Sequence, residues 1–372
     1  MKENTQRLLK KIVWICGTLY TFSFLTCCLT AYIEPARFSY LTYLAILFPY
    51  CFFGYLLWLA VVFIFFRKRI WIFLLILLPS WKNVSVVFSI HIPKEFVAKK
   101  DPRQLRLLSW NVNGMLYPLS DLTIRDEKQA AMMQFIRMTN ADVLCFQDYS
   151  EAAWAPGKPN IAYMKDSLGY PYHYFSDDFS NYGTIIFSRL PIIDSGHIKY
   201  PTRTAFTESL AFATIGFGGD TLRLYNTHLR SMFLHSDLLT PYNVGYLPFI
   251  AADTGYLFHT NRLERLTYFD TLHVAQARFL KQELNKTNMP YIFCADLNSV
   301  PSSYVYHHIK EGMQDAFLEK GAGLGGTYHR FTFSLRIDVV LLSKQLKATQ
   351  YFSPRPDLSD HYPIVTDIEL RK

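Results

Sequence analysis

The feature that most constrains this chain is a pair of long uncharged stretches near its start. Between Lys11 and Glu34 lie 22 residues without a charged side chain, and residues 40–66 form a second such stretch. A helix needs about 20 apolar residues to cross the hydrocarbon core of a bilayer. Half of the 372 residues are hydrophobic, which excludes a disordered chain and is too apolar for an ordinary soluble enzyme. The sequence therefore predicts a membrane protein with a large polar part.

The net charge of +8 belongs to the flanks of these stretches. Residues 1–92 carry nine Lys and Arg against two acidic residues, which gives +7, so the rest of the chain contributes only +1. Basic residues beside membrane spans set topology and meet anionic headgroups. A DNA-binding domain would be clearly basic, so this distribution argues against tight binding of a duplex.

The first 93 residues are predicted to form a membrane anchor with three transmembrane helices, over about 12–33, 40–66 and 70–92. Basic residues are more frequent before the first span and after the second than between them, which puts the N-terminus in the cytoplasm. The third segment contains fourteen Ile, Leu, Val or Phe residues against a single Lys82, so insertion is favoured. In the alternative, only residues 70–81 enter the membrane and the remainder stays on the cytoplasmic side.

After a linker over 94–104, residues 105–372 alternate short apolar stretches with polar loops. Strands are expected at 105–112, 141–148, 183–189, 222–229, 291–298, 336–343 and 362–370. Between them, Asp126 is expected to cap one helix and Glu264 to open another. This alternation predicts one mixed α/β domain with stacked layers. The stretch 231–261 is aromatic and nearly without helical period, so a long inserted loop is expected there.

The cysteines give no sign of a zinc site or a disulfide framework. No Cys-x-x-Cys pair occurs, and only Cys145 and Cys294 lie beyond the apolar start of the chain. Both lie in strand-like apolar stretches, so they are expected to be buried packing residues.

Several of the expected strands end in side chains that can bind a metal or a phosphate. The strand ends carry Asn111-Val112-Asn113, Gln147-Asp148, Thr227-His228, Asp296-Leu297-Asn298 and Ser359-Asp360-His361. Mg²⁺ takes oxygen ligands, and a hydrolase needs a base for water and a donor for the leaving oxygen. Each piece alone is a weak signal, because Asn111 could be a turn former and His228 a buried packing histidine. If the strand ends meet, these side chains form one site.

The ordered set of motifs is more specific than any one of them. The blocks SWNVNG, FQD, GTIIFSRLPI, NTHL, ADLNSVPSS, RIDVV and SDHYPI resemble, in order and spacing, the endonuclease/exonuclease/phosphatase family. The resemblance covers about residues 105–370, and the apolar start with the GLGGTY block is most similar to a membrane-anchored bacterial branch. It implies a four-layer α/β sandwich, in which two mixed β-sheets are flanked by helices. It also implies a hydrolytic site for phosphoesters that uses Mg²⁺ or Mn²⁺.

The resemblance also implies roles for the matching residues. It implies that Asn111 and Asp148 lie beside the metal, with Asp148 as the direct ligand. It also implies that Asp360 is a further carboxylate on the metal side. The family usually has glutamate at the position of Asp148, so the shorter side chain changes the reach to the metal, and Glu151 is the nearest substitute.

On the catalytic side, the resemblance implies five residues. Asp296 would orient or deprotonate the attacking water, and Asn298 would donate to the phosphate. His361, oriented by Asp338, would contact the scissile phosphate, and His228 would donate to the phosphate or the leaving group.

These features together predict a membrane-tethered, divalent-metal-dependent phosphoesterase. The substrate stays open between a lipid headgroup, an organophosphate and a nucleic acid, and the sequence allows no protein partner to be inferred. The alternative is a weakened or inactive module that binds phosphorylated ligands, which rests on Asp148. The expected location is a multi-pass protein of the cell membrane, the inner membrane of a bacterium, with the catalytic domain outside the cytoplasm. Tethering and the aromatic inserted loop fit a lipid headgroup or a small organophosphate better than a nucleic acid. Local core packing is the expected role of these aromatic residues and a membrane-dipping lid is the alternative: Phe233, Tyr242, Tyr246, Phe249, Tyr256 and Phe258.

Overall fold

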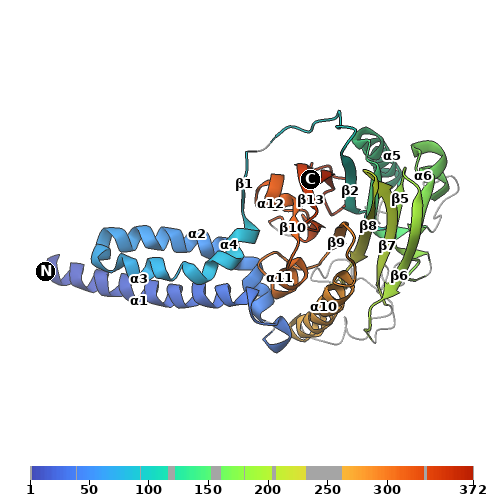
Figure 1. Ribbon diagram of the computed structural model, residues 1–372. Coiled ribbons are helices and arrows are strands. Elements are labelled where there is room, and N and C mark those ends of the chain that lie inside the picture. The colour runs from blue at the N-terminus through green and yellow to red at the C-terminus, as the bar shows by residue number, and fades with distance from the viewer. Residues whose placement is uncertain are drawn as a thin grey trace.

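The computed structural model describes residues 2–38, 40–92, 94–115, 122–151, 161–179, 181–202, 207–231, 262–330 and 333–371. Figure 1 shows two parts, an elongated helical bundle that contains the N-terminus and a sheet sandwich at its other end. The predicted loop over 231–261 lies outside the described residues except for Ser231. The aromatic side chains expected there lie outside them too.

The sandwich consists of two mixed six-stranded sheets. The order in the first sheet is β10 (Gln314–Asp315), β12 (Asp338–Leu342), β9 (Tyr291–Asp296), β8 (Asp220–His228), β7 (Ser209–Phe217) and β6 (Ile192–Lys199). The order in the second sheet is β13 (Leu346–Phe352), β14 (Ile364–Leu370), β2 (Leu105–Asn111), β3 (Val143–Ser150), β5 (Tyr182–Ser188) and β4 (Tyr172–Phe175). A small pair, β1 (Ser89–Ile90) with β11 (Ala322–Gly323), joins the end of the bundle to the sandwich.

Helices cover the outer faces of both sheets, which confirms the predicted α/β sandwich. The second sheet is covered by α5 (Leu122–Thr139) and α6 (Ile161–Leu168), and the first by α10 (Arg262–Leu284) and α11 (Tyr304–Lys310), while α12 (Ala316–Lys320) packs near β13. Because α5 starts at Leu122, Asp126 lies inside the helix and does not cap it as expected.

A layer of buried apolar side chains fills the space between the two sheets. Cys145 of β3 and Cys294 of β9 lie in it, both fully buried, together with branched aliphatic side chains of both sheets. The two thiols are free, as the sequence predicts. Strands that are buried on both faces, such as β9 and β12, are therefore nearly continuous apolar stretches in the sequence.

The bundle is built on two long helices, α1 (Lys2–Cys28) and α2 (Tyr40–Phe66). They are connected by short 3-10 turns, η1 (Leu29–Ala31) and η2 (Pro35–Arg37). Gly17 lets the Trp58 ring approach the α1 backbone so closely that a Cβ there would lie 1.8 Å from the ring. Gly54 makes room for the Tyr20 hydroxyl in the same way. Small residues that allow such approach are typical of helix contacts in membranes.

The predicted third span over 70–92 is not one continuous helix. After η3 (Arg67–Arg69) it forms α3 (Ile70–Leu75), η4 (Leu78–Ser80) and α4 (Trp81–Val87), and then enters β1. Pro79 lies at the break, where its ring removes a backbone donor. The segment still returns along α1, because Phe73 packs on Trp14 and the Asn83 amide donates to the carbonyl of Cys27. Within the described residues, two helical stretches are long and apolar enough to cross a membrane, Asn4–Ala31 and Tyr40–Leu75.

The predicted linker over 94–104 is attached to the sandwich. The buried Arg106 side chain forms a two-pronged ion pair with Asp367 at 2.7 and 2.9 Å and also donates to the carbonyls of Val97 and Ala98. Phe96 stacks on Phe352 with ring centroids 5.0 Å apart. The chain between the bundle and β2 is therefore held along one edge of the domain.

The bundle and the sandwich share one apolar core. A single cluster of buried side chains extends from Phe24 and Tyr55 in the bundle to Leu280 of α10 and Tyr306 of α11. Polar contacts reinforce the junction, since Glu34 forms an ion pair with Arg278. The two parts are therefore packed together as well as connected by the chain.

A buried carboxyl group at this junction gives a testable prediction. The Thr42 hydroxyl donates to Asp270 Oδ1 at 2.7 Å, and burial raises the pKa of Asp270 to about 7. A folded-state pKa above the unfolded value means that folding stability falls as the pH rises from about 4 to 7. We expect Asp270→Asn to raise the melting temperature of the full chain at pH 8 more than at pH 5. Asp194→Asn, at an exposed ion pair with Arg223, is the control, and an Asp270→Asn effect independent of pH would contradict the account.

Candidate active site

The ends of strands from both sheets meet at one end of the sandwich. In the second sheet, β2 and β3 are parallel and Asn111 lies opposite Gln147, which precedes Asp148. In the first sheet, β8 and β9 are parallel and His228 lies opposite Asp296. Because parallel strands end at the same edge, each pairing delivers two polar side chains to the same place. The structure therefore brings these strand ends together, as the sequence predicts, and the roles of their side chains stay a prediction.

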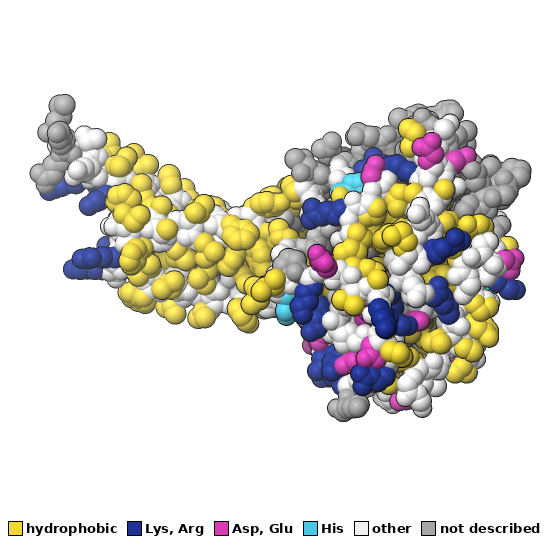
Figure 2. All heavy atoms as spheres, turned by 90° about the horizontal axis from the view of Figure 1, so that it is seen from above, with side chains coloured by type: hydrophobic (Ala, Val, Ile, Leu, Met, Phe, Trp, Pro, Cys, Tyr) yellow, Lys and Arg dark blue, Asp and Glu magenta, His cyan; other side chains and the backbone are white. Residues whose placement is uncertain are grey.

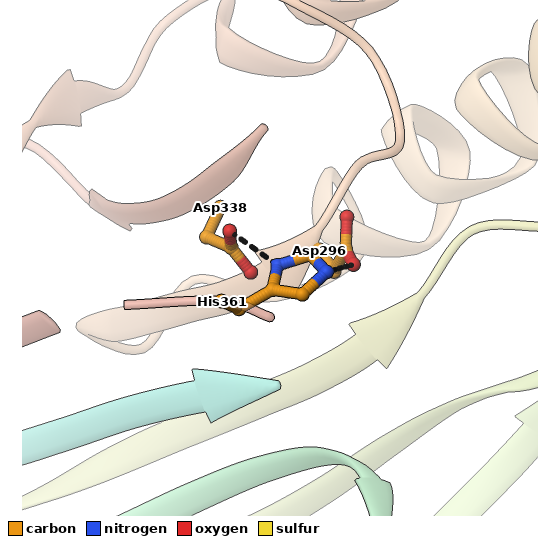
Figure 3. A group of neighbouring side chains, drawn as sticks. All are labelled: Asp296, Asp338 and His361. Atoms are coloured by element: carbon orange, nitrogen blue, oxygen red, sulfur yellow. Dashed lines mark hydrogen bonds and ion pairs between the residues drawn. The ribbon is translucent and has the colours of Figure 1, made fainter. Parts of the chain in front are cut away.

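Asp296, His361 and Asp338 form the centre of the group (Figure 3). Asp338 begins β12 and lies directly opposite Asp296 in the antiparallel pairing of β12 with β9. His361 Nδ1 lies 2.8 Å from Asp338 Oδ2, and its Nε2 lies 3.6 Å from Asp296 Oδ2. The carboxylate of Asp338 therefore fixes the ring of His361, whose second nitrogen faces Asp296.

A second histidine lies near the same oxygen of Asp296. His228 Nε2 lies 3.6 Å from Asp296 Oδ2, and His228 Nδ1 lies 3.0 Å from Asp148 Oδ1. Asn298 lies beside this ring, with its amide nitrogen 2.9 Å from His228 Nε2. The Asn111 amide links the two carboxylates, donating to Asp148 at 3.1 Å and to Asp296 at 2.9 Å.

Asp148 reaches the site from an irregular point in β3. The pairing of β3 with β5 shifts register between Phe146 and Tyr149, and Asp148 has a φ of 50°. Aspartate tolerates this left-handed conformation better than most residues, and bulges of this kind redirect side chains near functional sites. Glu151, the substitute considered from the sequence, instead accepts a hydrogen bond from the Tyr149 hydroxyl at 2.9 Å.

Asp360 lies at the edge of the group. Its carboxylate accepts a hydrogen bond from the Ser359 hydroxyl at 3.3 Å and lies 3.9 Å from Arg330 Nε. Among the described residues it makes no hydrogen bond or ion pair with Asn111 or Asp148, its expected companions on the metal side.

The structure adds residues that the sequence analysis did not single out. Tyr182 is buried beside Asp148, whose carboxylate, together with burial, raises the pKa of the phenol well above its usual range. The Tyr328 ring packs on His361 with centroids 4.8 Å apart. The Thr327 hydroxyl accepts from the backbone amide of Asp338 at 3.2 Å. The GLGGTY block contains Thr327 and Tyr328 and was the available signal, and Tyr182 directly precedes the GTIIFSRLPI block.

Carboxylates determine the electrostatics of the site. Burial alone would lower the pKa of His361, but the carboxylates of Asp338 and Asp296 raise it to about 10. In the same way Asp148 outweighs burial and raises the pKa of His228 to about 9. Burial and the neighbouring Asp338 raise the pKa of Asp296 to about 6. Both imidazoles are therefore drawn toward the protonated form by a negatively charged environment.

This donor set fits a hard divalent cation. Four carboxylates, those of Asp148, Asp296, Asp338 and Asp360, outnumber two imidazoles, and Asn111 adds an amide oxygen. Asp338 Oδ1 is buried and has no hydrogen-bond partner among the described residues. Carboxylate and amide oxygens are the ligands that Mg²⁺ and Mn²⁺ prefer. Asp148 and Asp338 each pair with a histidine, His228 and His361, and the Asn111 amide oxygen accepts from the Asn113 backbone amide at 3.0 Å.

Comparisons with known proteins agree with this architecture. The sequence model of the Endonuclease/Exonuclease/phosphatase family matches residues 108–361. A separate model, described as a domain of unknown function, matches residues 10–87, which cover most of the helical bundle. No curated protein matches the chain.

Solved structures share the fold of the sandwich. Humanized D. rerio TDP2 is 19% identical, with a TM-score of 0.51, and the match covers 72% of this chain and 99% of that one. The human Nocturnin catalytic domain with bound sulfate anion is 17% identical, with a TM-score of 0.52 and coverage of 72% and 94%. An endonuclease/exonuclease/phosphatase from Bacteroides vulgatus is 16% identical, with a TM-score of 0.51 and coverage of 72% and 99%. At these identities the likeness concerns the fold.

The position of Asp148 predicts how metal affinity responds to its removal. We expect Asp148→Ala to weaken Mn²⁺ binding, measured by calorimetry on the full chain, by at least about 10-fold, the lower range for residues around a metal. Asp148→Glu should keep or tighten binding, because it keeps the charge and adds one methylene of reach. Asp166→Asn, on the exposed face of α6, is the control. Unchanged affinity in Asp148→Ala would show that the cation binds elsewhere.

Proposed function

The chain belongs to the endonuclease/exonuclease/phosphatase family, and from this premise we propose that it is a membrane-tethered, divalent-metal-dependent phosphoesterase. The family name joins enzymes that cleave phosphoester bonds. One observation carries the proposal: Asp296 lies 3.6 Å from each of two histidines, one held by Asp338 and the other by Asp148. A buried carboxylate between two oriented imidazoles suits hydrolysis by water, since one group can accept a proton while others support phosphate charge.

We assign the roles from these contacts. Asp296, buried at the end of β9, orients the attacking water and accepts its proton. His361 donates to a phosphate oxygen from Nε2, because its Nδ1 is engaged with Asp338 at 2.8 Å. This carboxylate–imidazole pair fixes which nitrogen faces the substrate.

Two further groups complete the donor set on the phosphate. His228 and Asn298 lie side by side at 2.9 Å, and both are proposed to donate to the phosphate or to the leaving oxygen. The Asn298 backbone amide donates to Asp296 Oδ1 at 2.9 Å, so the loop that carries Asn298 also orients the base.

A divalent cation, Mg²⁺ or Mn²⁺, is proposed to be held by Asn111 and Asp148, with Asp360 on the same side. When bound, it would polarise a phosphate oxygen and offset developing charge. The bulge at Asp148 moves the backbone of this residue, and this is our explanation of how an aspartate serves where the family usually has a glutamate.

We further propose that the bundle spans the membrane and leaves the catalytic domain outside the cytoplasm. Large apolar side chains are exposed along it, among them Phe22, Leu57, Phe63 and Trp71, and Figure 2 shows its surface as largely hydrophobic. Lys and Arg side chains gather at the end of the bundle far from the sandwich. By the positive-inside rule that end is cytoplasmic. If a reporter that works only in the cytoplasm is fused to the C-terminus and is found to be active, this result would contradict the orientation.

The junction favours a substrate held at the membrane surface. The loop that follows Asn298 is fastened to the anchor, because the Thr30 hydroxyl donates to the Ser302 carbonyl at 2.8 Å and the Ser302 hydroxyl donates to the Ala45 carbonyl at 2.6 Å. Leu335, near Tyr328, packs on Ala45 in the same cluster. Of the three substrate classes, we therefore propose a phosphoester in a lipid headgroup.

A substrate panel tests this choice. Full-length protein in lipid nanodiscs should hydrolyse a phospholipid headgroup faster than DNA, an inositol phosphate or a generic soluble phosphodiester, because the catalytic loops lie next to the anchor. A preference for DNA or for a soluble phosphate ester would reject the lipid assignment and keep the phosphoesterase. Binding without hydrolysis of any of them would favour the inactive, ligand-binding module.

The catalytic roles are tested by two substitutions. Asp296→Asn and His361→Ala should each lower kcat by about 10²–10⁴-fold, the usual contribution of general acid–base groups. KM should change much less, because these groups act where transition-state charge develops. Asp166→Asn and His173→Ala, both exposed, are the matched controls. Near-normal turnover in both site variants, with normal melting temperatures, would reject the assignment.

A further inference from the structure

A cavity lies away from the candidate active site, at the junction of the bundle and the sandwich. It has a volume of about 330 Å³ and lies between α4 and α11, which lie side by side in Figure 1. Lys82 lines it from the bundle, and Tyr304, His307, His308 and Lys310 line it from the sandwich. This volume is at the lower end of the range found for ligand pockets, about 300–1,000 Å³.

The cavity has an excess of positive charge. In the part of the chain that the structure describes, neither lysine forms an ion pair: the Lys82 ammonium donates to the Ala31 carbonyl at 2.8 Å, and the Lys310 ammonium lies 3.5 Å from the Met313 carbonyl. The one carboxylate in the lining, that of Glu311, is largely exposed and lies 3.5 Å from the Lys281 ammonium. Lys82 and Lys310 therefore line the cavity, and neither ammonium group is paired with a carboxylate of the described residues.

Burial and this positive charge both act on His307, one of the two histidines of the cavity. Burial, with the ammonium groups of Lys82 and Lys310, lowers the pKa of His307 to about 3, so its ring is neutral at physiological pH. His307 Nε2 lies 3.2 Å from the Asn83 side-chain oxygen, which leaves the ring fixed between the bundle and α11. The cavity thus holds two ammonium groups beside the neutral His307 ring, and ammonium groups are strong hydrogen-bond donors to phosphate.

The surroundings of Lys82 match the boundary of a membrane. Trp81 and Leu78 are 70% and 68% exposed, and the Lys82 ammonium lies 4.2 Å from the centre of the half-exposed Tyr32 ring. Trp, Tyr and Lys are enriched where a membrane protein passes from hydrocarbon to headgroup. The exposed Leu78 and Trp81 beside the cationic cavity suit a lipid, whose acyl chains would contact these side chains while its headgroup enters the cavity.

We propose that this cavity binds the phosphate headgroup of an anionic membrane lipid at a site distinct from the catalytic one. The proposal rests on the membrane placement of the bundle argued above, and it does not depend on catalysis. The bound lipid would connect α4 to α11, and α11 begins only a few residues after Asn298. Anionic lipid would therefore strengthen the attachment of the catalytic loops to the anchor.

The test uses the full-length protein in two kinds of nanodisc, one of phosphatidylcholine alone and one that also contains phosphatidylglycerol. Phosphatidylglycerol should raise the melting temperature by at least about 3 °C, the shift expected when a ligand well above its Kd binds only the folded state. The double variant Lys82→Gln/Lys310→Gln should lose this shift, and Lys82→Arg/Lys310→Arg should keep most of it. Lys286→Gln, at an exposed lysine on the sandwich surface, should keep all of it.

Three results would overturn the proposal. The first is an equal melting temperature in both nanodiscs, and the second is a full shift in the Gln double variant. The third is the same shift from inorganic phosphate in phosphatidylcholine nanodiscs, which would assign the cavity to a soluble anion. Protein that stays soluble without nanodiscs would instead contradict the membrane placement, so the two failures can be told apart.

Discussion

Two parallel strand pairings, β2 with β3 and β8 with β9, are the constraint on which the candidate active site depends. Each pairing ends at the same edge of its sheet, and the packing of the two sheets brings these edges together. The antiparallel pairing that places Asp338 opposite Asp296 then adds the partner of His361. Residues separated by more than 200 positions, such as Asn111 and Asp338, thus meet at the strand ends. The central part of the site is therefore a consequence of sheet topology.

The same topology places several carboxylates near one another, and neighbouring histidines partly compensate their repulsion. Four carboxylates are brought together, and they raise the pKa of His228 to about 9 and that of His361 to about 10, so that positive charge on these rings would offset the repulsion. A divalent cation would provide the same compensation from the side of Asn111 and Asp148. The protein therefore carries a locally unfavourable charge arrangement, which is typical of functional sites and rarely needed for folding alone.

Much of this arrangement could be predicted from the sequence, because strands buried on both faces are continuous apolar stretches and their ends carry distinctive motifs. Strands such as β6, which is largely exposed, lack that signal and were not predicted. The break of the third span follows from Pro79 and the buried Asn83. The Asn83 amide donates to Cys27 of α1 and Thr30 of η1, and summed hydropathy does not record such partners. The docking of Ser302 on the anchor joins residues about 260–270 positions apart, which no local pattern encodes.

The central claim is metal-dependent hydrolysis of a phosphoester by the site at the strand ends. The most direct test is the rate at which metal-free, full-length protein cleaves a generic phosphodiester, first with excess chelator and then with added Mg²⁺ or Mn²⁺. The account predicts no cleavage above background with chelator and restored cleavage with either metal, because the oxygen-rich site needs a hard cation. Equal rates in chelator and in metal would contradict it.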